Sequence, residues 1–387
     1  MSSDGLGEVS LPELLSFIVD NRGRTCPVVE DGFPLIATNS VVEGSRRVVP
    51  KDVRYVDDET YRTWFRAHPE PNDVLFVCKG TPGKVALVPD PVPYCIAQDM
   101  VALRANPETA DSAYLYYRLS APDVREAIEG LHVGSLIPHF KKGDFGKLRF
   151  RVHDLPEQRR IAAVLSSLDD LIEHNRGQSG VMNDLWRTLV LSHADGADEV
   201  KLSDLARFVN GRNFTKDASG GGLPVIRTPE VRNGPSANTV RSDVQANEDN
   251  VARLGDILFV WSGSLLVDRW AYEPGLVNQH IFKVLPNDGV PAWLALWAIE
   301  QLMVDFLGVA ADKATTMGHI KREDLNRTVN VPPREQWSEL DAKIMPLYDL
   351  SMDLQAEIND LTRTRDELLP LLMSGAIRVD ETLEVSA

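Results

Sequence analysis

Several stretches of the sequence contain residue types that could do chemistry, but their spacing matches no catalytic motif. The GTPGK stretch at 80–84 is too short for the phosphate-binding loop G-x-x-x-x-G-K-S/T. Residues 90–94 (DPVPY) approach the Asn/Asp-Pro-Pro-aromatic motif with which N-methyltransferases hold a flipped base, but the inserted valine changes the turn. The eight histidines lack metal-ligand spacing, and no glycine-rich strand-to-helix turn for an adenosyl cofactor is present. The missing motifs favour a binding protein over an enzyme.

The elements that would position binding residues occur twice along the chain. EVSLPELLSFI at 8–18 returns as EVKLSDLARFV at 199–209, and NDVLFVCKG at 72–80 returns as GDILFVWSG at 255–263. Four further matches keep the same order: GFPLIAT with GLPVIRT, Gln98 with Gln279, PHFKKGDF with GHIKREDL, and the Glu-Gln pairs at 157–158 and 335–336. Six matches in one order indicate an internal duplication.

Each half has the pattern of a mixed α/β globule. Residues 74–77 (VLFV) and 257–260 (ILFV) are β-branched or aromatic in large part and predict strands. Residues 114–130 and 291–307 predict helices, the second with a proline near its start. Glycine- and proline-rich stretches between these segments predict loops.

A helical arm is expected after each globule. Apolar residues in 156–192 and 344–372 follow alternating steps of four and three residues, which is typical of a coiled-coil seam. Pro346 predicts that the second arm starts there, with the proline in its first turn. Such a stripe can pack on its own globule. Two long arms after two similar globules favour antiparallel pairing with each other instead.

Composition and cysteine usage indicate a cytoplasmic globular protein of two or three domains. The chain has 387 residues, of which 43% are hydrophobic and 25% charged. Its longest apolar runs are too short to cross a bilayer, and the first residues lack the features of a signal peptide. Cys26, Cys78 and Cys95 form an odd, sparse set that we expect to be buried and reduced.

The net charge of −16 does not by itself favour a DNA partner, because phosphate neutralisation supplies most non-specific affinity. Lys and Arg minus Asp and Glu gives −4 for residues 1–154, −3 for 155–198, −2 for 199–332 and −7 for 333–387. The acidity is therefore densest in the two segments expected to be helical. Residues 141–151 hold five basic groups against one acid, so a DNA-binding face would be local.

Three stretches resemble the specificity subunits of Type I restriction–modification systems. They are LPEQRRIAAVLSSLDDLIEHNR at 155–176, the G-S-x-I-P-H-F-x-x-x-D-F pattern at 134–145, and LLPLLMSGAIRV at 368–379. The resemblance covers essentially the whole chain, because the family alternates a target-recognition domain with a conserved helix, twice. The second copy of the Glu-Gln motif, at 331–344, lacks the Arg-Arg-Ile-Ala continuation of the first.

The resemblance implies an α+β fold with two similar mixed α/β target-recognition domains, separated by two long antiparallel coiled-coil helices. It places target-recognition domains at 1–154 and 199–332 and conserved helical regions at 155–198 and 333–387. Each domain would read one half of a bipartite DNA target, and the helices would act as a rigid ruler between the two. A helix of about 35 residues spans about 50 Å.

The resemblance also implies partners. The chain would bind double-stranded DNA, modification (methyltransferase) subunits, expected as two, and restriction (translocase and nuclease) subunits, but no membrane. It would be non-catalytic and carry no cofactor or metal itself. S-adenosylmethionine, ATP and magnesium would bind the partner subunits.

On this basis, the DNA-contacting residues are expected among polar loop positions, each of which could equally be a solvated surface residue. Gln can pair with adenine and Arg with guanine. Charges shared by both halves suit phosphates, since phosphate contacts fix position and not sequence. The positions matched between the halves are Lys79 and Thr81 with Ser262 and Ser264; His139, Lys141 and Lys142 with His319, Lys321 and Arg322; Gln98 with Gln279; and Asn39 with the neighbourhood of Arg227 and Thr228. The candidates for base readout, which differ between the halves, are Arg46, Arg47, Arg232, Asn233 and Arg269.

Three rival classes remain open at this point. A methyltransferase would bind S-adenosylmethionine as an isolated chain. A free-standing transcriptional regulator would bind DNA tightly without a catalytic partner. An adaptor that binds only proteins would show no salt-dependent affinity for DNA.

Overall fold

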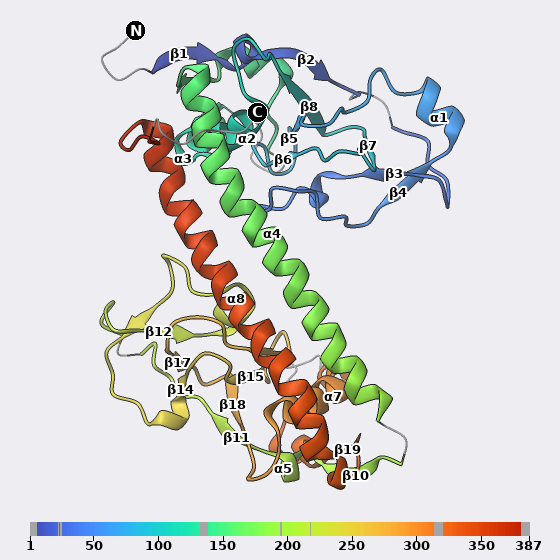
Figure 1. Cartoon of the computed structure of the whole chain (residues 1–387), viewed down its shortest axis with the longest axis vertical. Helices are drawn as coiled ribbons and strands as arrows, with labels where there is room; N and C mark the ends of the chain where they lie inside the picture. The colour runs from blue at the N-terminus through green and yellow to red at the C-terminus, as the bar shows by residue number, and fades with distance from the viewer. Residues whose placement is uncertain are drawn as a thin grey trace. The chain divides into compact units, whose positions relative to one another are not determined.

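The computed structural model describes residues 6–21, 23, 25–131, 138–193, 196–216, 218–312 and 320–380 (Figure 1). The chain divides into two compact units. Unit 1 comprises Met1–Asp170 and Thr362–Ala387, and unit 2 comprises Leu171–Leu361. Because the second segment of unit 1 follows unit 2 in the sequence, both ends of the chain belong to unit 1.

Unit 1 contains three sheets. A four-stranded antiparallel sheet has the order β2-β8-β5-β6, a three-stranded sheet the order β4-β3-β7, and β1 pairs with β9. In the three-stranded sheet β3 is antiparallel to β4 but parallel to β7. The strands are β1 (Gly7–Ser10), β2 (Leu15–Val19), β3 (Phe33–Ile36), β4 (Arg54–Val56), β5 (Val74–Val77), β6 (Val85–Leu87), β7 (Cys95–Ile96), β8 (Met100–Ala105) and β9 (Arg149–Val152).

Unit 2 repeats this arrangement. Its four-stranded sheet has the order β11-β18-β15-β16, a second sheet the order β13-β12-β17-β14, and β10 pairs with β19. As in unit 1, the second sheet contains one parallel pair, here β12 with β17. The duplication expected from the sequence is therefore confirmed by topology. The strands are β10 (Asp198–Lys201), β11 (Ala206–Asn210), β12 (Leu223–Ile226), β13 (Arg241–Ser242), β14 (Val251–Ala252), β15 (Ile257–Val260), β16 (Leu266–Arg269), β17 (Gly275–Val277), β18 (Ile281–Pro286) and β19 (Thr328–Val331).

The strands predicted at VLFV and ILFV are β5 and β15, each one of the two inner strands of its four-stranded sheet and buried on both faces. Side chains alternate between the faces of a strand. Val74 and Phe76 therefore join one hydrophobic core while Leu75 and Val77 join another. Ile257 and Phe259 of β15 do the same against Leu258 and Val260. The continuous apolar runs are thus explained by a core on each side of each sheet.

Short helices complete the globules, and one prediction needs correction. The helix expected over 114–130 is two helices, α2 (Ser112–Ser120) and α3 (Pro122–Leu131). Pro122 has no backbone N–H, and it forces the preceding Ala121 into an extended conformation with ψ 144°. The break lies between these two residues. The remaining short helices are α1 (Asp58–Thr63), α5 (Leu202–Leu205) and α6 (Thr228–Asn233).

The helix expected near 291–307 is α7 (Ala292–Asp312). By length and composition its Ala292–Val309 segment could span a membrane, and half of that segment is buried within the protein. The largest core cluster of unit 2 contains Trp293, Leu294 and Phe306 of this helix, and all three are fully buried. Its apolar composition is therefore that of a core helix.

The two arms are the helices α4 (Leu155–Ser192) and α8 (Trp337–Ser374), each of 38 residues. The two helices run in opposite directions: the start of α4 lies beside the end of α8, and the end of α4 lies beside the start of α8 (Figure 1). In unit 1, Asp169 of α4 bonds to Arg365 of α8, at 2.7 Å between Oδ1 and Nη1. In unit 2, Ser179 donates to the Ser351 carbonyl at 3.1 Å, and the rings of Trp186 and Tyr348 lie 5.7 Å apart. Partner numbers fall on α8 as they rise on α4, as antiparallel pairing requires.

The two alternatives considered for the arms prove to be compatible. The helices pair with each other, and each also packs on a globule. Ile161 and Leu165 of α4 join Leu372 and Met373 of α8 in the core of unit 1, beside residues of its sheet. In unit 2, Trp186 and Ile344 occupy the same core as the sheet residues Phe259 and Phe282. The helices are therefore part of the globular cores.

The predicted start of the second arm at Pro346 is wrong, because α8 begins nine residues earlier, at Trp337. Pro346 is exposed and lies inside the helix, where its missing N–H leaves the carbonyl of Ala342 without the usual partner. Trp337 and Leu340 are buried in the core of unit 2 and extend the apolar stripe backwards past the proline. Tertiary packing thus overrides the local break.

Candidate nucleic-acid interface

In unit 1, three loop segments meet at the end of strand β5. The Cys78 N–H donates to the carbonyl of Asp99 at 2.8 Å, which attaches the turn before β8. The Phe140 N–H donates to the carbonyl of Cys78, also at 2.8 Å, which attaches the segment that begins at residue 138. Lys79 and His139 form a β-bridge beside this point. The turn before β8 and the segment that begins at residue 138 are thus both held at the end of β5 by backbone hydrogen bonds.

Unit 2 uses the same framework at the end of β15. Trp261 stands where unit 1 has Cys78: its N–H donates to the His280 carbonyl at 3.2 Å, and its carbonyl accepts from Ile320 N–H at 2.9 Å. The turn before β18 and the segment that begins at residue 320 therefore meet as their counterparts do in unit 1. The backbone geometry is shared, while the side chains differ.

The second sheet of each unit brings one more loop to this end. Leu35 pairs with Cys95 and Ile36 with Ile96 in the parallel pair β3–β7, so the chain leaves both strands at the same edge. The loop after β3 carries Asn39, and the turn after β7 carries Gln98. In unit 2 the parallel pair β12–β17 likewise places the loop after Ile226 beside the turn after Val277.

Most of the predicted contact residues therefore lie on loops that converge at one end of their unit. In unit 1 these are Asn39, Lys79, Thr81, Gln98, His139, Lys141 and Lys142. In unit 2 they are Arg227, Thr228, Ser262, Ser264, Gln279, Lys321 and Arg322. Arg232 and Asn233 lie at the end of α6, next to Gly234, which approaches Tyr272 beyond the end of β16. His319 lies outside the described residues. Their contact with DNA remains a prediction.

The cations at this end of unit 1 are partly neutralised. Lys79 Nζ lies 3.8 Å from Asp99 Oδ1, and Lys142 Nζ lies 3.2 Å from Asp20 Oδ2. Asn39 Nδ2 donates to Asp52 Oδ2 at 2.8 Å. All three pairs have exposed members, and exposed ion pairs contribute little net stability. A phosphate oxygen could replace the carboxylate at small cost.

The cations of unit 2 differ in how they are engaged. Arg227, which precedes α6, bonds to Glu230 in its first turn, at 2.7 Å between Nη2 and Oε1. Burial raises the pKa of Glu230, but the hydrogen bonds and charge of Arg227 outweigh it and hold that pKa below its ordinary value. Lys321 pairs with Glu323 at 3.2 Å. Arg322 is exposed and has no ion pair with any described residue, so it is the cation of this end that is better placed to meet DNA. Arg232 is also exposed and has no such ion pair.

Arg46 and Arg269 do not fit the role of base readout that the sequence suggested. The Arg46 side chain is 6% exposed and bonds to Asp170 and the Ser166 carbonyl of α4. Arg269 is half-buried and donates to the Tyr348 carbonyl at 2.5 Å and to Ser351 Oγ at 2.7 Å on α8. Both arginines attach a globule to a helix of its own unit.

Arg47 is intermediate between these cases. It is half-buried, and its Nη1 donates to the Leu87 carbonyl at 3.4 Å, at the end of β6. Its guanidinium also lies near Tyr94, whose pKa burial raises well above the ordinary value. Arg47 thus lies at the end of a strand, and its role in base readout remains a prediction.

Three residues at the same end of unit 2 were missed. Asn210 ends β11, Arg212 follows two residues later, and Trp261 comes directly after β15. Gly211 lets this loop pass close to the neighbouring strand, since a Cβ there would lie 2.1 Å from the Asn278 carbonyl oxygen. The Arg212 N–H donates to the Val277 carbonyl at 3.0 Å. The turn-forming sequence Asn-Gly-Arg-Asn at 210–213 was the signal that could have identified this loop.

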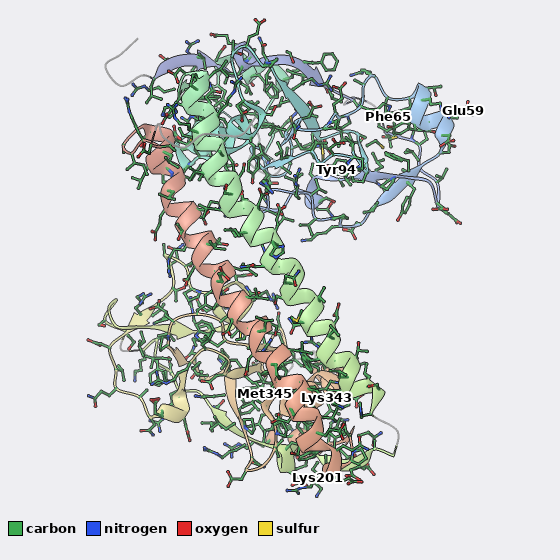
Figure 2. All side chains as sticks on the ribbon, viewed as in Figure 1. Glu59, Phe65, Tyr94, Lys201, Lys343 and Met345 are labelled. Atoms are coloured by element: carbon green, nitrogen blue, oxygen red, sulfur yellow. The ribbon has the colours of Figure 1, made fainter. Side chains whose placement is uncertain are left out.

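The described residues contain no group of three or more His, Cys, Asp or Glu side chains that could hold a metal ion. Tyr94, in the motif that approaches that of N-methyltransferases, is buried in a core of unit 1 and has 5% of its side chain exposed (Figure 2). A ring in that position cannot stack on a flipped base. Cys26, Cys78 and Cys95 are free and buried, as expected.

Together, the fold and this end of each unit define a duplicated binding protein with loop-borne polar residues. Residues 32–180 and 195–363 match the family model described as Type I restriction modification DNA specificity domain. The chain belongs to this family and contains two copies of its domain. It is a specificity subunit of the Type I restriction–modification class.

Several curated relatives share this description. A specificity subunit of the Type I restriction enzyme MjaVIII from Methanocaldococcus jannaschii is 28% identical over 80% of this chain and 80% of its own length. The MjaIX specificity subunit from the same organism is 24% identical over 70% of each chain. The EcoKI specificity subunit of Escherichia coli strain K12 is 23% identical over 67% of this chain and 63% of its own.

A solved structure agrees with the fold. The crystal structure of a Type-I restriction-modification system S subunit from M. genitalium superposes with a TM-score of 0.62 and is 16% identical in sequence. The match covers 96% of this chain and 97% of that one. The α+β fold with two similar domains and two long helices is therefore confirmed.

Proposed function

We propose that this chain reads a bipartite DNA target, with one half-site bound by each target-recognition domain. The observation that carries the proposal is the repeated convergence of polar loops at one end of each unit, on the same backbone framework. Lys141 and Lys142 follow Phe140 as Lys321 and Arg322 follow Ile320, and the loops around them differ. Shared cations suit phosphates, and differing loops suit bases.

We further propose that the chain is non-catalytic and binds no cofactor of its own. The support is the lack of matching spacing in the sequence and the burial of Tyr94. Methyl transfer from S-adenosylmethionine, and ATP- and magnesium-dependent translocation and cleavage, would belong to partner subunits. A purified chain is expected to transfer no labelled methyl group to DNA and to hydrolyse no ATP.

The partners proposed are double-stranded DNA, two modification subunits and restriction subunits. Two modification subunits would match the two copies of the domain. The location proposed is the cytoplasm, where the DNA and the three free, buried cysteines would both be found.

An exchange of domains tests the two-reader proposal. Residues 199–332 would be replaced by the equivalent segment of another family member, and the chimera expressed with the modification subunits of this system. Methylome sequencing should then show one half of the methylated sequence changed and the other half unchanged. The reciprocal exchange of residues 1–154 is the matched control and should change the opposite half.

Two outcomes would contradict the proposal. A change of both half-sites in either chimera would show that the domains do not read independently. A methylated sequence without two parts, from the wild-type complex, would show that the duplication does not correspond to two readers.

A further inference from the structure

The side chain of Asn210 is fixed in one orientation by the indole of Trp261. Trp261 Nε1 lies 2.9 Å from Asn210 Oδ1, and an indole N–H can only donate. The oxygen of the amide must therefore face Trp261, which leaves the Nδ2 group on the opposite side. This contact settles an orientation that is otherwise ambiguous for an asparagine.

The backbone of Asn210 is fixed as well. Asn250, which is 4% exposed, donates from Nδ2 to the Asn210 carbonyl at 3.1 Å. The ring of Trp261 lies 5.7 Å from that of the buried Phe282, in a stacked arrangement. The exposed donor of Asn210 is thus held by the buried Asn250 and the half-buried Trp261. Such preorganisation is what discrimination between bases requires, since a side chain free to turn can adapt to any base.

These residues line a hollow whose wall also includes two cationic side chains. Its volume is about 340 Å³, and its walls are Asn210, Trp261, Phe282, Ile320, Lys321 and Arg322. Lys321 and Arg322 are exposed, and we expect them to bind phosphates. A base edge held near such phosphates would meet the Asn210 amide and the apolar wall of the indole.

Unit 1 lacks this arrangement on the same framework. The last residue of β2 is Val19, where β11 ends with Asn210, and both Val19 and Cys78 are 0% exposed. Phe140, the counterpart of Ile320, is 0% exposed in the same core as Cys78, and its ring stacks on that of Phe145 at 5.5 Å. The donor and its hollow are therefore a property of the second domain alone among the described residues.

We propose that Asn210, oriented by Trp261, is a specificity-determining residue that donates from Nδ2 to an acceptor on a base edge in the second half-site. The base would be guanine, adenine or thymine, which present acceptors in the major groove, and not cytosine, which presents only a donor. This inference rests on the proposed function of the second domain as a reader.

The substitution Asn210→Asp tests the direction of the hydrogen bond. Aspartate has the same shape and keeps the bond from Trp261, but its outward atom accepts instead of donating. With the modification subunits present, methylome sequencing should show a shift at one position of the second half-site, toward cytosine or adenine on the contacted strand. The preference should change by about tenfold or more. Asn238→Asp adds the same charge to an exposed position of unit 2 and should leave the sequence unchanged.

Trp261→Phe tests the orienting role separately. Phenylalanine keeps an aromatic wall but removes the N–H, so the Asn210 amide can turn either way. The same position of the half-site should then become degenerate, without a new preference. If methylation falls too low to sequence, DNA selected by the complex from a pool randomised in the second half-site gives the preference directly.

The outcomes separate this inference from the proposed function. A wild-type complex that methylates a two-part sequence, with both variants giving the same sequence, would overturn the role of Asn210 and leave the two-reader proposal standing. A wild-type complex that shows no sequence preference would overturn the proposed function itself. Thermal unfolding of both variants, matched to wild type, shows that the fold is retained.

Discussion

At the scale of single residues, the pair formed by Asp169 and Arg365 sets the register of α4 against α8 within unit 1. The side chains are 3% and 8% exposed, and Tyr117 also donates to Asp169, at 2.6 Å. Burial alone would lower the pKa of Arg365, but the two neighbouring aspartates outweigh it and raise that pKa above its ordinary value. A buried pair adds little net stability, whereas separating its members costs about 3–5 kcal/mol. A shift of register would do so.

The shared cations give a prediction for DNA binding. Lys321→Ala and Arg322→Ala should each weaken DNA binding by the complex while the preferred sequence stays the same, because a lost phosphate contact acts on all sequences alike. Each should also lower the slope of log affinity against log salt by about one unit. Fluorescence anisotropy over a series of salt concentrations measures this slope. A steady slope, or a relaxed methylated sequence, would contradict the phosphate role.

His153 predicts a pH dependence of stability. Burial lowers its pKa, and its Nδ1 lies 2.9 Å from the Tyr114 hydroxyl, which also accepts from the His153 N–H. Because the unfolded chain binds this proton more readily, stability is fully present above the ordinary pKa near 6.5 and is lost as the pH falls below it.

His153→Asn keeps an acceptor for Tyr114 but does not titrate. The free energy of unfolding should therefore fall less for this variant than for wild type between pH 7.5 and pH 5.5, measured by urea denaturation at about these two values. His174→Asn, on the exposed surface of α4, is the control. Equal losses in wild type and His153→Asn would show that another group is responsible.

The internal repeat determined which site residues could be predicted from the sequence. Lys141 and Lys321 could be found because each has a counterpart, and both lie at the loop ends that the structure brings together. Asn210 and Trp261 correspond to the buried, apolar Val19 and Cys78, so the search for polar residues shared by the two halves passed over them. The burial of Arg269 depends on its contact with Tyr348 of α8, which lies 79 residues further along the sequence. No local sequence pattern encodes that contact.

At the scale of elements, periodicity predicted the helices well and their boundaries poorly. The arms exist because steps of three and four residues between mostly apolar side chains persist along much of each 38-residue helix. Prolines had opposite effects in two places: Pro122 divides a predicted helix, while Pro346 sits inside one. The difference is packing, since buried Trp337 and Leu340 stabilise the turns before Pro346.

Two glycines in α4 give a prediction for this helix. Gly177 and Gly180 are exposed, and a Cβ at either would meet no atom within 4 Å. Gly177→Ala and Gly180→Ala should each stabilise the chain by up to about 1 kcal/mol, because alanine loses less backbone freedom on folding. Thermal unfolding measures the gain. Gly211→Ala is the contrasting variant and should destabilise unit 2, since its Cβ would overlap a carbonyl oxygen.

If the alanine variants at 177 and 180 lowered the unfolding temperature, both positions would have a contact that open space does not suggest. A partner subunit present in the assay could provide one. The measurement is therefore made on the isolated chain first, and then on the complex.

At the scale of the whole molecule, unit 1 is built from both ends of the chain. Leu372, Met373 and Val379 belong to the same core as Leu11 and Val74, and the Val379 N–H donates to Glu157 Oε1 at 3.4 Å. A change at the far end of the sequence should therefore destabilise the first globule and spare the second.

Leu372→Ala tests this expectation. Leu372 is 3% exposed, and loss of a packed leucine costs about 2–5 kcal/mol. Hydrogen exchange followed by mass spectrometry should show faster exchange in β5 and β8 and no change in β15 and β18. The neighbouring Leu371 is 43% exposed, and Leu371→Ala should change neither unit. Faster exchange in both units of the Leu372 variant would mean that they unfold together.

This discontinuity also has a consequence for biosynthesis. A ribosome releases the first globule early, but the helical turns from Thr362 and the residues up to Val379, which complete its core, are translated after unit 2. The core of the domain made first therefore stays incomplete, without Leu372, Met373 and Val379, while the whole of unit 2 is synthesised. The order of maturation is the reverse of the order of translation. During that interval the nascent chain is a natural client for chaperones that bind exposed apolar surface.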